Sequence, residues 1–130
     1  MSTCRGLTPF CCLLVLLATA CTTWVDKREA EAKASRLAVA EIQANRQRAS
    51  SIIVAIEAYE RDHRQLPDEL GALVPTYLSH VPDTTAGENY GYWLEEFEGY
   101  YLCFGLVSKP DLHCCYSYRS KGWDCSMGGD

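Results

Sequence analysis

Cysteine is the residue type with the most chemical potential in this chain of 130 residues, which contains eight of them. They fall into two groups of four, one near the N-terminus and one in the last third: Cys4, Cys11, Cys12 and Cys21, then Cys103, Cys114, Cys115 and Cys125. Four cysteines in an exported domain are typical of two disulfide bridges. A zinc site needs paired Cys-x-x-Cys spacing or nearby histidines. Only His113 is close here, so we expect no metal.

The alternation of side chains along a strand ranks the possible cysteine pairs. On an expected strand over residues 100–107, three apolar residues share one face, so Cys103 lies on the other face. On the following strand Cys115 belongs to the polar face and Cys114 to the apolar face. This pattern predicts bridges Cys103–Cys115 and Cys114–Cys125. A register slip of one residue would instead give Cys103–Cys114 with Cys115–Cys125, and this alternative remains open.

Patterns typical of catalysis or of nucleic-acid binding are absent from the sequence. His63, His80 and His113 are scattered, with no Ser or Cys nucleophile elbow beside them. No glycine-rich phosphate loop occurs. The net charge is −5, and from residue 65 onward three basic residues face ten acidic ones, which makes nucleic acid an unfavourable partner. We therefore expect no enzymatic activity and no cofactor.

Two groups of residues have alternative interpretations. The first is a set of aromatic residues: Tyr90, Tyr92, Trp93, Phe97, Tyr100 and Tyr101. Such a set forms either the core of a small sheet, which is commoner, or the wall of a ligand groove. The second is Glu95, Glu96 and Glu98, for which a solvated turn between strands is favoured over a site for a hard cation.

One long helix is expected over residues 26–64, because this stretch contains no Gly or Pro and is rich in good helix formers. Its first half is charged nearly all round. Its second half carries an apolar stripe at helical spacing, which predicts a face packed on the rest of the domain. The stripe consists of Val39, Ile42, Ala49, Ile52, Ile53, Ile56 and Tyr59.

Beyond the helix, residues 65–130 are expected to form a globular domain, which begins with a short helical connection and a loop and changes to a period of two at residue 90. Strands are expected over 90–94 and 100–107, followed by a hairpin of 113–119 and 123–126. The predicted fold class is therefore α+β: a long N-terminal helix packed on a small antiparallel sheet of three to four strands and stapled by disulfides.

Residues 1–25 are predicted to be a targeting segment, either a signal peptide or a membrane anchor. Phe10 to Ala20 is an apolar run without charge, shorter than the ~20 residues of a typical membrane span. The sequence Ala18-Thr19-Ala20-Cys21 at its end resembles the lipobox of bacterial lipoproteins. This resemblance implies lipidation of Cys21. The alternative is that Cys21 is an ordinary residue of a signal peptide or anchor.

A second resemblance covers about a third of the chain, from residue 49 to residue 92. The order and spacing of these residues resemble the bacterial type IV pilin and type II secretion pseudopilin family, in particular its major-pseudopilin branch. The matching residues are Ile56-Glu57-Ala58-Tyr59-Glu60-Arg61-Asp62-His63-Arg64-Gln65-Leu66-Pro67, then Leu70, Leu73, Val74-Pro75, Tyr77-Leu78, Val81-Pro82-Asp83 and Gly87-Glu88-Asn89-Tyr90-Gly91-Tyr92.

The resemblance implies a pilin-like fold and a non-enzymatic role in the bacterial cell envelope. The chain would be a structural or accessory component of a secretion or pilus-type assembly, held to the membrane by its N-terminal anchor and contacting protein partners through the long helix. Family members are cleaved after a Gly, and Gly6-Leu7 resembles that junction. The family carries Glu at the fifth mature position, where this chain has Cys11. The alternative role is a lipid-anchored periplasmic binding module that keeps the fold but does not polymerise.

Overall fold

A computed structural model describes the backbone of residues 9–127 and the side chains of residues 24–126. The chain divides into two units, Met1–Arg36 and Leu37–Asp130, which are considered separately below. The expected junction Gly6-Leu7 lies outside the described residues. Cys21 is part of a described helix, but its side chain lies outside the described part of the chain.

The first element is the helix α1, Pro9–His63. It covers the stretch predicted over 26–64 except for the last residue, and it begins earlier, at Pro9. Proline suits the first turn of a helix because its missing N–H would have no helical partner there. The helix ends where the Arg64 N–H donates to Glu60 O at 2.8 Å and Arg64 takes a φ of 60°. A left-handed residue directly after the last turn is a common helix stop. Side chains 24–36, in the first unit, are all exposed.

In the second unit, α1 buries one face from Ala38 onward. Ile52 and Ile56 are fully buried, and Tyr59 is half-buried. The sequence prediction was wrong at Val39, which is 60% exposed, while its neighbour Ala38 is buried. Consecutive helical residues point about 100° apart, so a stripe of this width includes only one of the two. Asn45, a polar residue left out of the predicted stripe, is also fully buried.

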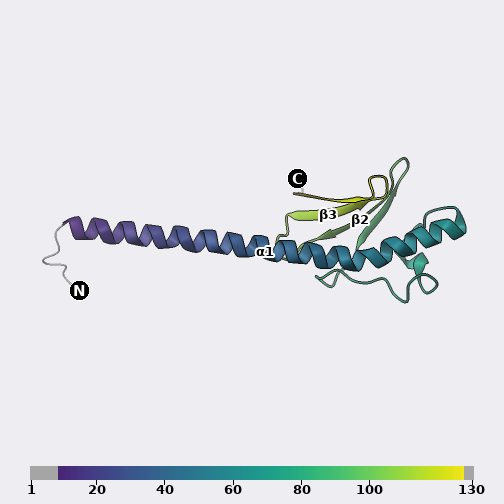
Figure 1. Cartoon of the computed structure of the whole chain (residues 1–130), viewed down its shortest axis with the longest axis horizontal. Coiled ribbons are helices and arrows are strands. Elements are labelled where there is room, and N and C mark those ends of the chain that lie inside the picture. The colour runs from purple at the N-terminus through teal and green to yellow at the C-terminus, as the bar shows by residue number, and fades with distance from the viewer. Residues whose placement is uncertain (1–8, 128–130) are drawn as a thin grey trace. The chain divides into compact units, whose positions relative to one another are not determined.

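The connection between α1 and the sheet contains one short element, the 3-10 helix η1, Leu70–Leu73, whose last residue is buried. The chain then runs back along α1 (Figure 1). There the guanidinium of Arg48 donates to the backbone oxygens of Asp83 at 3.1 Å and Thr84 at 3.3 Å. The connection therefore covers part of the helix before it enters the sheet.

Four antiparallel strands form one sheet in the order β1-β2-β3-β4. Their bounds are β1 Gly91–Glu95, β2 Gly99–Gly105, β3 Leu112–Ser117 and β4 Gly122–Met127. The register places Leu102 opposite both Tyr92 and Tyr116. This arrangement agrees with the α+β class and with the upper end of the expected strand number.

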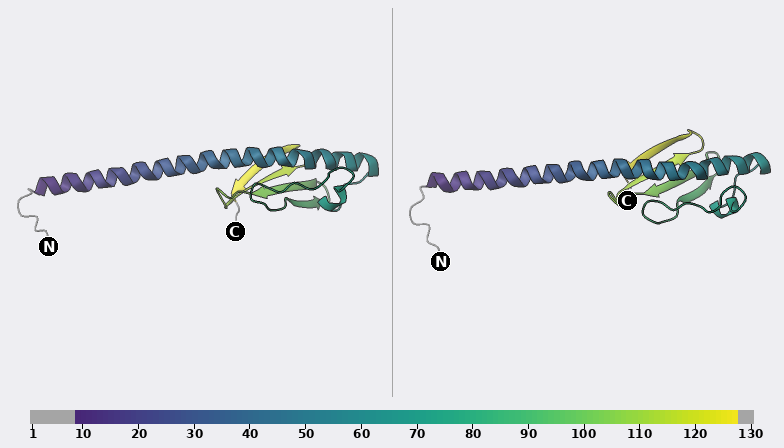
Figure 2. Two further views of the ribbon diagram at one scale, coloured as in Figure 1. Left: turned by 90° about the horizontal axis from the view of Figure 1, so that it is seen from below. Right: turned by 60° about the horizontal axis from the view of Figure 1, so that its bottom comes forward.

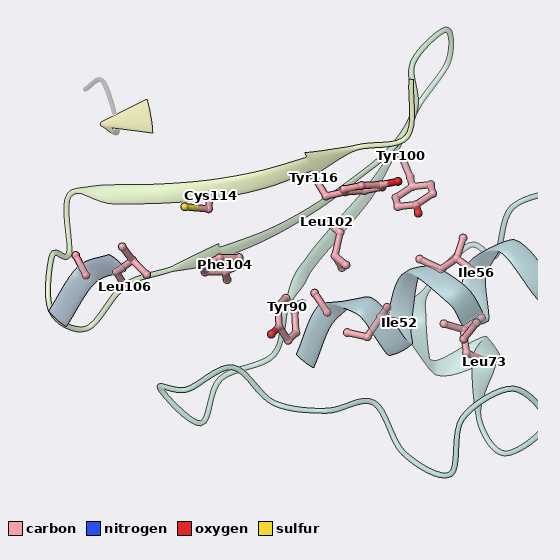
Figure 3. Close-up of a cluster of buried hydrophobic side chains, with 13 residues drawn as sticks. Ile52, Ile56, Leu73, Tyr90, Tyr100, Leu102, Phe104, Leu106, Cys114 and Tyr116 are labelled. Atoms are coloured by element: carbon pink, nitrogen blue, oxygen red, sulfur yellow. The ribbon is translucent and has the colours of Figure 1, made fainter. Parts of the chain in front are cut away.

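One face of the sheet packs on the second half of α1 (Figure 2). Leu102 points from β2 toward Ile52 and Ile56 of the helix, and the Tyr116 ring of β3 lies beside Tyr100 (Figure 3). Burial of this apolar face against the helix stripe supplies the main stabilisation of the second unit, at roughly 25 cal/mol per Å² removed from water. The opposite face of the sheet is called the outer face below.

Candidate functional site

The structure brings the four late cysteines together in two bridges. Cys103 of β2 lies opposite Cys115 of β3, with S–S 2.00 Å, on the outer face. Cys114 of β3 lies opposite Cys125 of β4, with S–S 2.03 Å, on the face that packs on α1. These are the pairs favoured by the alternation of strand faces, and the alternative pairing does not occur.

With their sulfurs in bridges, these four cysteines offer no thiolate to a metal or a substrate. Across the described side chains, no group of three or more His, Cys, Asp or Glu residues is placed to hold a metal ion. Glu98, one of the three acids of the expected turn, pairs instead with Arg119. Glu95 is the exposed last residue of β1, and Glu96 and Glu98 belong to the turn between β1 and β2.

The histidines do not converge. His63 stacks on Tyr59 with ring centroids 4.0 Å apart, and His80 Nδ1 lies 3.1 Å from Ser79 Oγ. Beside His63, the Tyr77 hydroxyl donates to Asp62 Oδ2 at 2.8 Å, and this hydrogen bond is the main cause of the raised pKa of Tyr77. The sequence offered no signal for this exposed cluster. It fastens the end of α1 to the connection and contains no nucleophile.

A second polar cluster fastens the middle of α1. The Glu41 carboxylate accepts hydrogen bonds from the Val107 N–H at 2.7 Å and from Ser108 N at 3.0 Å and Oγ at 2.5 Å. Partial burial opposes the ionisation of Glu41, but the bonds from Ser108 and Val107 outweigh it, so the pKa of Glu41 is lowered. One turn further on, Asn45 exchanges hydrogen bonds with Thr85 at 2.7 and 3.0 Å. These contacts position the loops against the helix.

The feature of α1 best suited to a partner is its face away from the sheet. Between residues 39 and 54 every side chain on this face is exposed and none is charged. We call it the uncharged strip: Val39, Ala40, Gln43, Ala44, Gln47, Ser50, Ser51 and Val54. It spans more than four helical turns, and charged residues return only at Glu57 and Arg61.

The two serines of the uncharged strip are suited to burial against another surface. Ser50 Oγ donates to Gln47 O at 2.6 Å, and Ser51 Oγ donates to Arg48 O at 2.9 Å. Because these hydroxyl hydrogens are already bonded within the helix, a covering surface would not leave them without acceptors. Small side chains also let a second helix approach closely. The sequence signal for this strip was the absence of charge at one set of helical positions, which the apolar stripe alone did not reveal.

In the part of the chain that the structure describes, no helix is apolar enough over a sufficient length to cross a membrane. Comparisons of the chain with protein-family models, with curated proteins and with solved structures found no match.

Proposed function

We propose that this chain is a non-enzymatic, pilin-like protein of the bacterial cell envelope, and that it serves as a structural or accessory component of a secretion or pilus-type assembly. The observation that carries the proposal is the uncharged strip on α1. An exposed face of this length without charge is unusual in a chain with 22% charged residues, because solvated helix faces are normally rich in charge. A protein partner that covers the strip explains the absence of charge.

The proposal also draws on three other features. The helix is long and its second half lies on an antiparallel sheet. The sequence from residue 49 to residue 92 resembles the pilin and pseudopilin family. The apolar run Phe10 to Ala20 supplies an anchor that would hold α1 at the membrane. In this arrangement the strip packs on a helix of a neighbouring subunit.

A charge placed in the strip tests the proposal. In the full chain expressed in a bacterium, Ala44→Arg should disrupt the assembly, because a guanidinium buried in a helix interface without a partner is costly. Ala34→Arg is the matched control, since Ala34 is an exposed alanine of the same helix in the part charged all round. Native electrophoresis of solubilised membranes should show a large complex that Ala44→Arg dissociates and Ala34→Arg preserves. A wild-type chain that migrates as a monomer would refute the proposal.

The alternative function is a lipid-anchored periplasmic binding module that does not polymerise, and Ala18-Thr19-Ala20-Cys21 is the observation that favours it. The intact mass of the mature protein separates the two. A chain that begins at Leu7 retains the apolar helix and fits the assembly. A chain that begins at a diacylated Cys21 fits the binding module, and Cys21→Ala should then leave an uncleaved precursor.

A further inference from the structure

The outer face of the sheet has two aromatic side chains in a side-by-side row. Trp93 of β1 and Tyr101 of β2 are directly opposite in the register. Their rings stack with centroids 5.8 Å apart and planes 26° apart. Trp93 is 43% exposed although it belongs to a strand whose partner β2 is largely buried. An exposed indole stacked beside a second aromatic ring offers a flat apolar surface to a ligand.

Gly91, the neighbour of Trp93 on the same face of β1, allows the indole ring to lie close to the sheet. Gly91 precedes Trp93 by two residues, and a Cβ built at Gly91 would lie 3.3 Å from Trp93 Cζ3. The missing side chain therefore leaves space into which the indole ring leans. The result is an indole held by Gly91 and Tyr101, with part of its surface open to solvent.

A hollow continues this surface on the other side of Tyr101, and its lining is more apolar than polar. It has a volume of about 340 Å³ and is lined by Tyr101, Cys115, Ser117, Ser120, Asp124 and Ser126. The strand register explains the hollow. Across the four strands the paired residues are Trp93, Tyr101, Ser117 and Gly122, so the side chains become smaller from β1 to β4. The Cys103–Cys115 bridge ties the strands beneath it.

The charges around the hollow select against an anionic ligand. The two nearby cations are already engaged, Arg119 with Glu98 and Lys121 with Glu57 at 3.7 Å. Among the described residues, the Asp124 carboxylate has neither a hydrogen bond nor an ion pair. The hollow thus presents several hydroxyls, which both donate and accept, and one free carboxylate, which only accepts. A ligand rich in neutral hydroxyl groups matches this set.

We propose that the outer face binds an uncharged polysaccharide. The apolar C–H face of one sugar ring packs on the exposed indole of Trp93 on β1. Hydroxyls of rings further along the same polysaccharide bond to Ser117 on β3 and to Asp124 and Ser126 on β4. An aromatic wall combined with a few convergent polar groups is the usual composition of a small-ligand site. This site is independent of the uncharged strip, which lies on the opposite side of the second unit's core. The inference therefore does not rest on the proposed assembly.

The test is a titration of the full chain, solubilised in a detergent without a sugar headgroup, with chitohexaose and with cellohexaose. Calorimetry should show that at least one hexasaccharide binds, and that added salt changes the affinity little because no charge pair forms. Trp93→Ala should weaken binding about tenfold or more, and Asp124→Asn should weaken it severalfold. Phe97→Ala is the matched control, since Phe97 is 86% exposed but belongs to the turn after β1, and it should leave binding unchanged.

Near-UV circular dichroism establishes that each variant is folded before it is titrated. The proposal is overturned if neither hexasaccharide binds the wild-type chain, or if Trp93→Ala and Asp124→Asn bind as the wild type does. Hexalysine serves as a competing probe. Salt-sensitive binding of hexalysine without any binding of sugar would assign the outer face to a cationic peptide and would equally overturn the proposal.

Discussion

At the scale of single residues, Gly99 has a backbone conformation and a close neighbour that no other residue type would fit without strain, and the sequence did not single it out. Gly99 opens β2 with a φ of 85°, a conformation that residues with a side chain rarely adopt. A Cβ at this position would lie 2.4 Å from Tyr118 Cδ1. The Tyr118 ring therefore covers Gly99 directly, and from there its hydroxyl donates to Glu60 Oε1 of α1 at 3.0 Å.

Gly99→Ala should lower the free energy of unfolding by about 2–4 kcal/mol, because left-handed strain and a steric clash add together. Gly87→Ala is the matched control. Gly87 has a similar φ of 76°, but nothing lies within 4 Å of a Cβ built there, so only the strain of about 1–2 kcal/mol should appear. Urea unfolding measures both. Equal losses would show that the Tyr118 ring moves aside at no cost.

At the scale of elements, the packed stripe of α1 determines the stability of the second unit. Its buried and exposed residues alternate within a single turn, as the fully buried Ile56 and the 64% exposed Val54 illustrate. Polar contacts at Glu41 and Asn45 then fix which loops lie against which turn of the helix.

Ile56→Ala should cost roughly 2–5 kcal/mol of stability, since it leaves a cavity between helix and sheet. Val54→Ala, two residues earlier, should change stability by less than about 0.5 kcal/mol, and so should Lys33→Ala on the charged half of the helix. Chemical denaturation of the three variants provides the comparison. Similar losses at Ile56 and Lys33 would contradict the division of α1 into a packed and an unpacked half.

The two disulfide bridges are the second feature that stabilises the second unit at the scale of elements. They close loops of nearly equal length, with sequence separations of 12 and 11. Removal of either bridge by paired Cys→Ala substitution should therefore cost about the same, roughly 2–4 kcal/mol, because loop closure in the unfolded chain depends mainly on loop length. Urea unfolding measures the losses, and non-reducing peptide mapping identifies the pairs. A peptide that joins Cys103 to Cys114 would contradict the structure.

At the scale of the whole molecule, the second unit has an unusual share of its core in tyrosine. Tyr90 and Tyr100 are almost fully buried and Tyr92 is half-buried. Burial raises the pKa of Tyr90 to about 12, and burial is also the first cause of the raised pKa values of Tyr92 and Tyr100. The core therefore favours neutral phenols at several positions at once.

The raised pKa values of the buried tyrosines predict that the protein unfolds at alkaline pH. The unfolded chain releases its phenolic protons near pH 10, whereas the folded chain holds them to higher pH. Stability should be fully present below about pH 10 and should fall as the pH rises toward 12, since deprotonation then favours the unfolded state. Unfolding free energies at about pH 8, 10 and 11 measure the slope. Tyr90→Phe should reduce the slope while it loses the hydrogen bond to Asn45 O, and a flat profile in the wild type would contradict the assignment.

The sequence alone determined the features that depend on local periodicity. A stretch without Gly or Pro predicted the helix, and the shift to a period of two predicted the strands. The alternation of strand faces ranked the cysteine pairs, because side chains two residues apart share a face whatever the rest of the chain does.

The tertiary structure decided what depends on contacts between distant residues. Glu41 and Asn45 contact loop residues that are 66 and 40 positions away, and no local pattern specifies how the connection from residue 64 to residue 90 returns along the helix. The tertiary structure also decided the environment of Val39. This residue is apolar like the stripe, but its angular position on α1 places it on the exposed face. The same is true of Trp93, whose exposure follows from which face of the sheet the helix covers. Local sequence sets the direction in which each side chain points, and only the packed fold determines what lies in that direction.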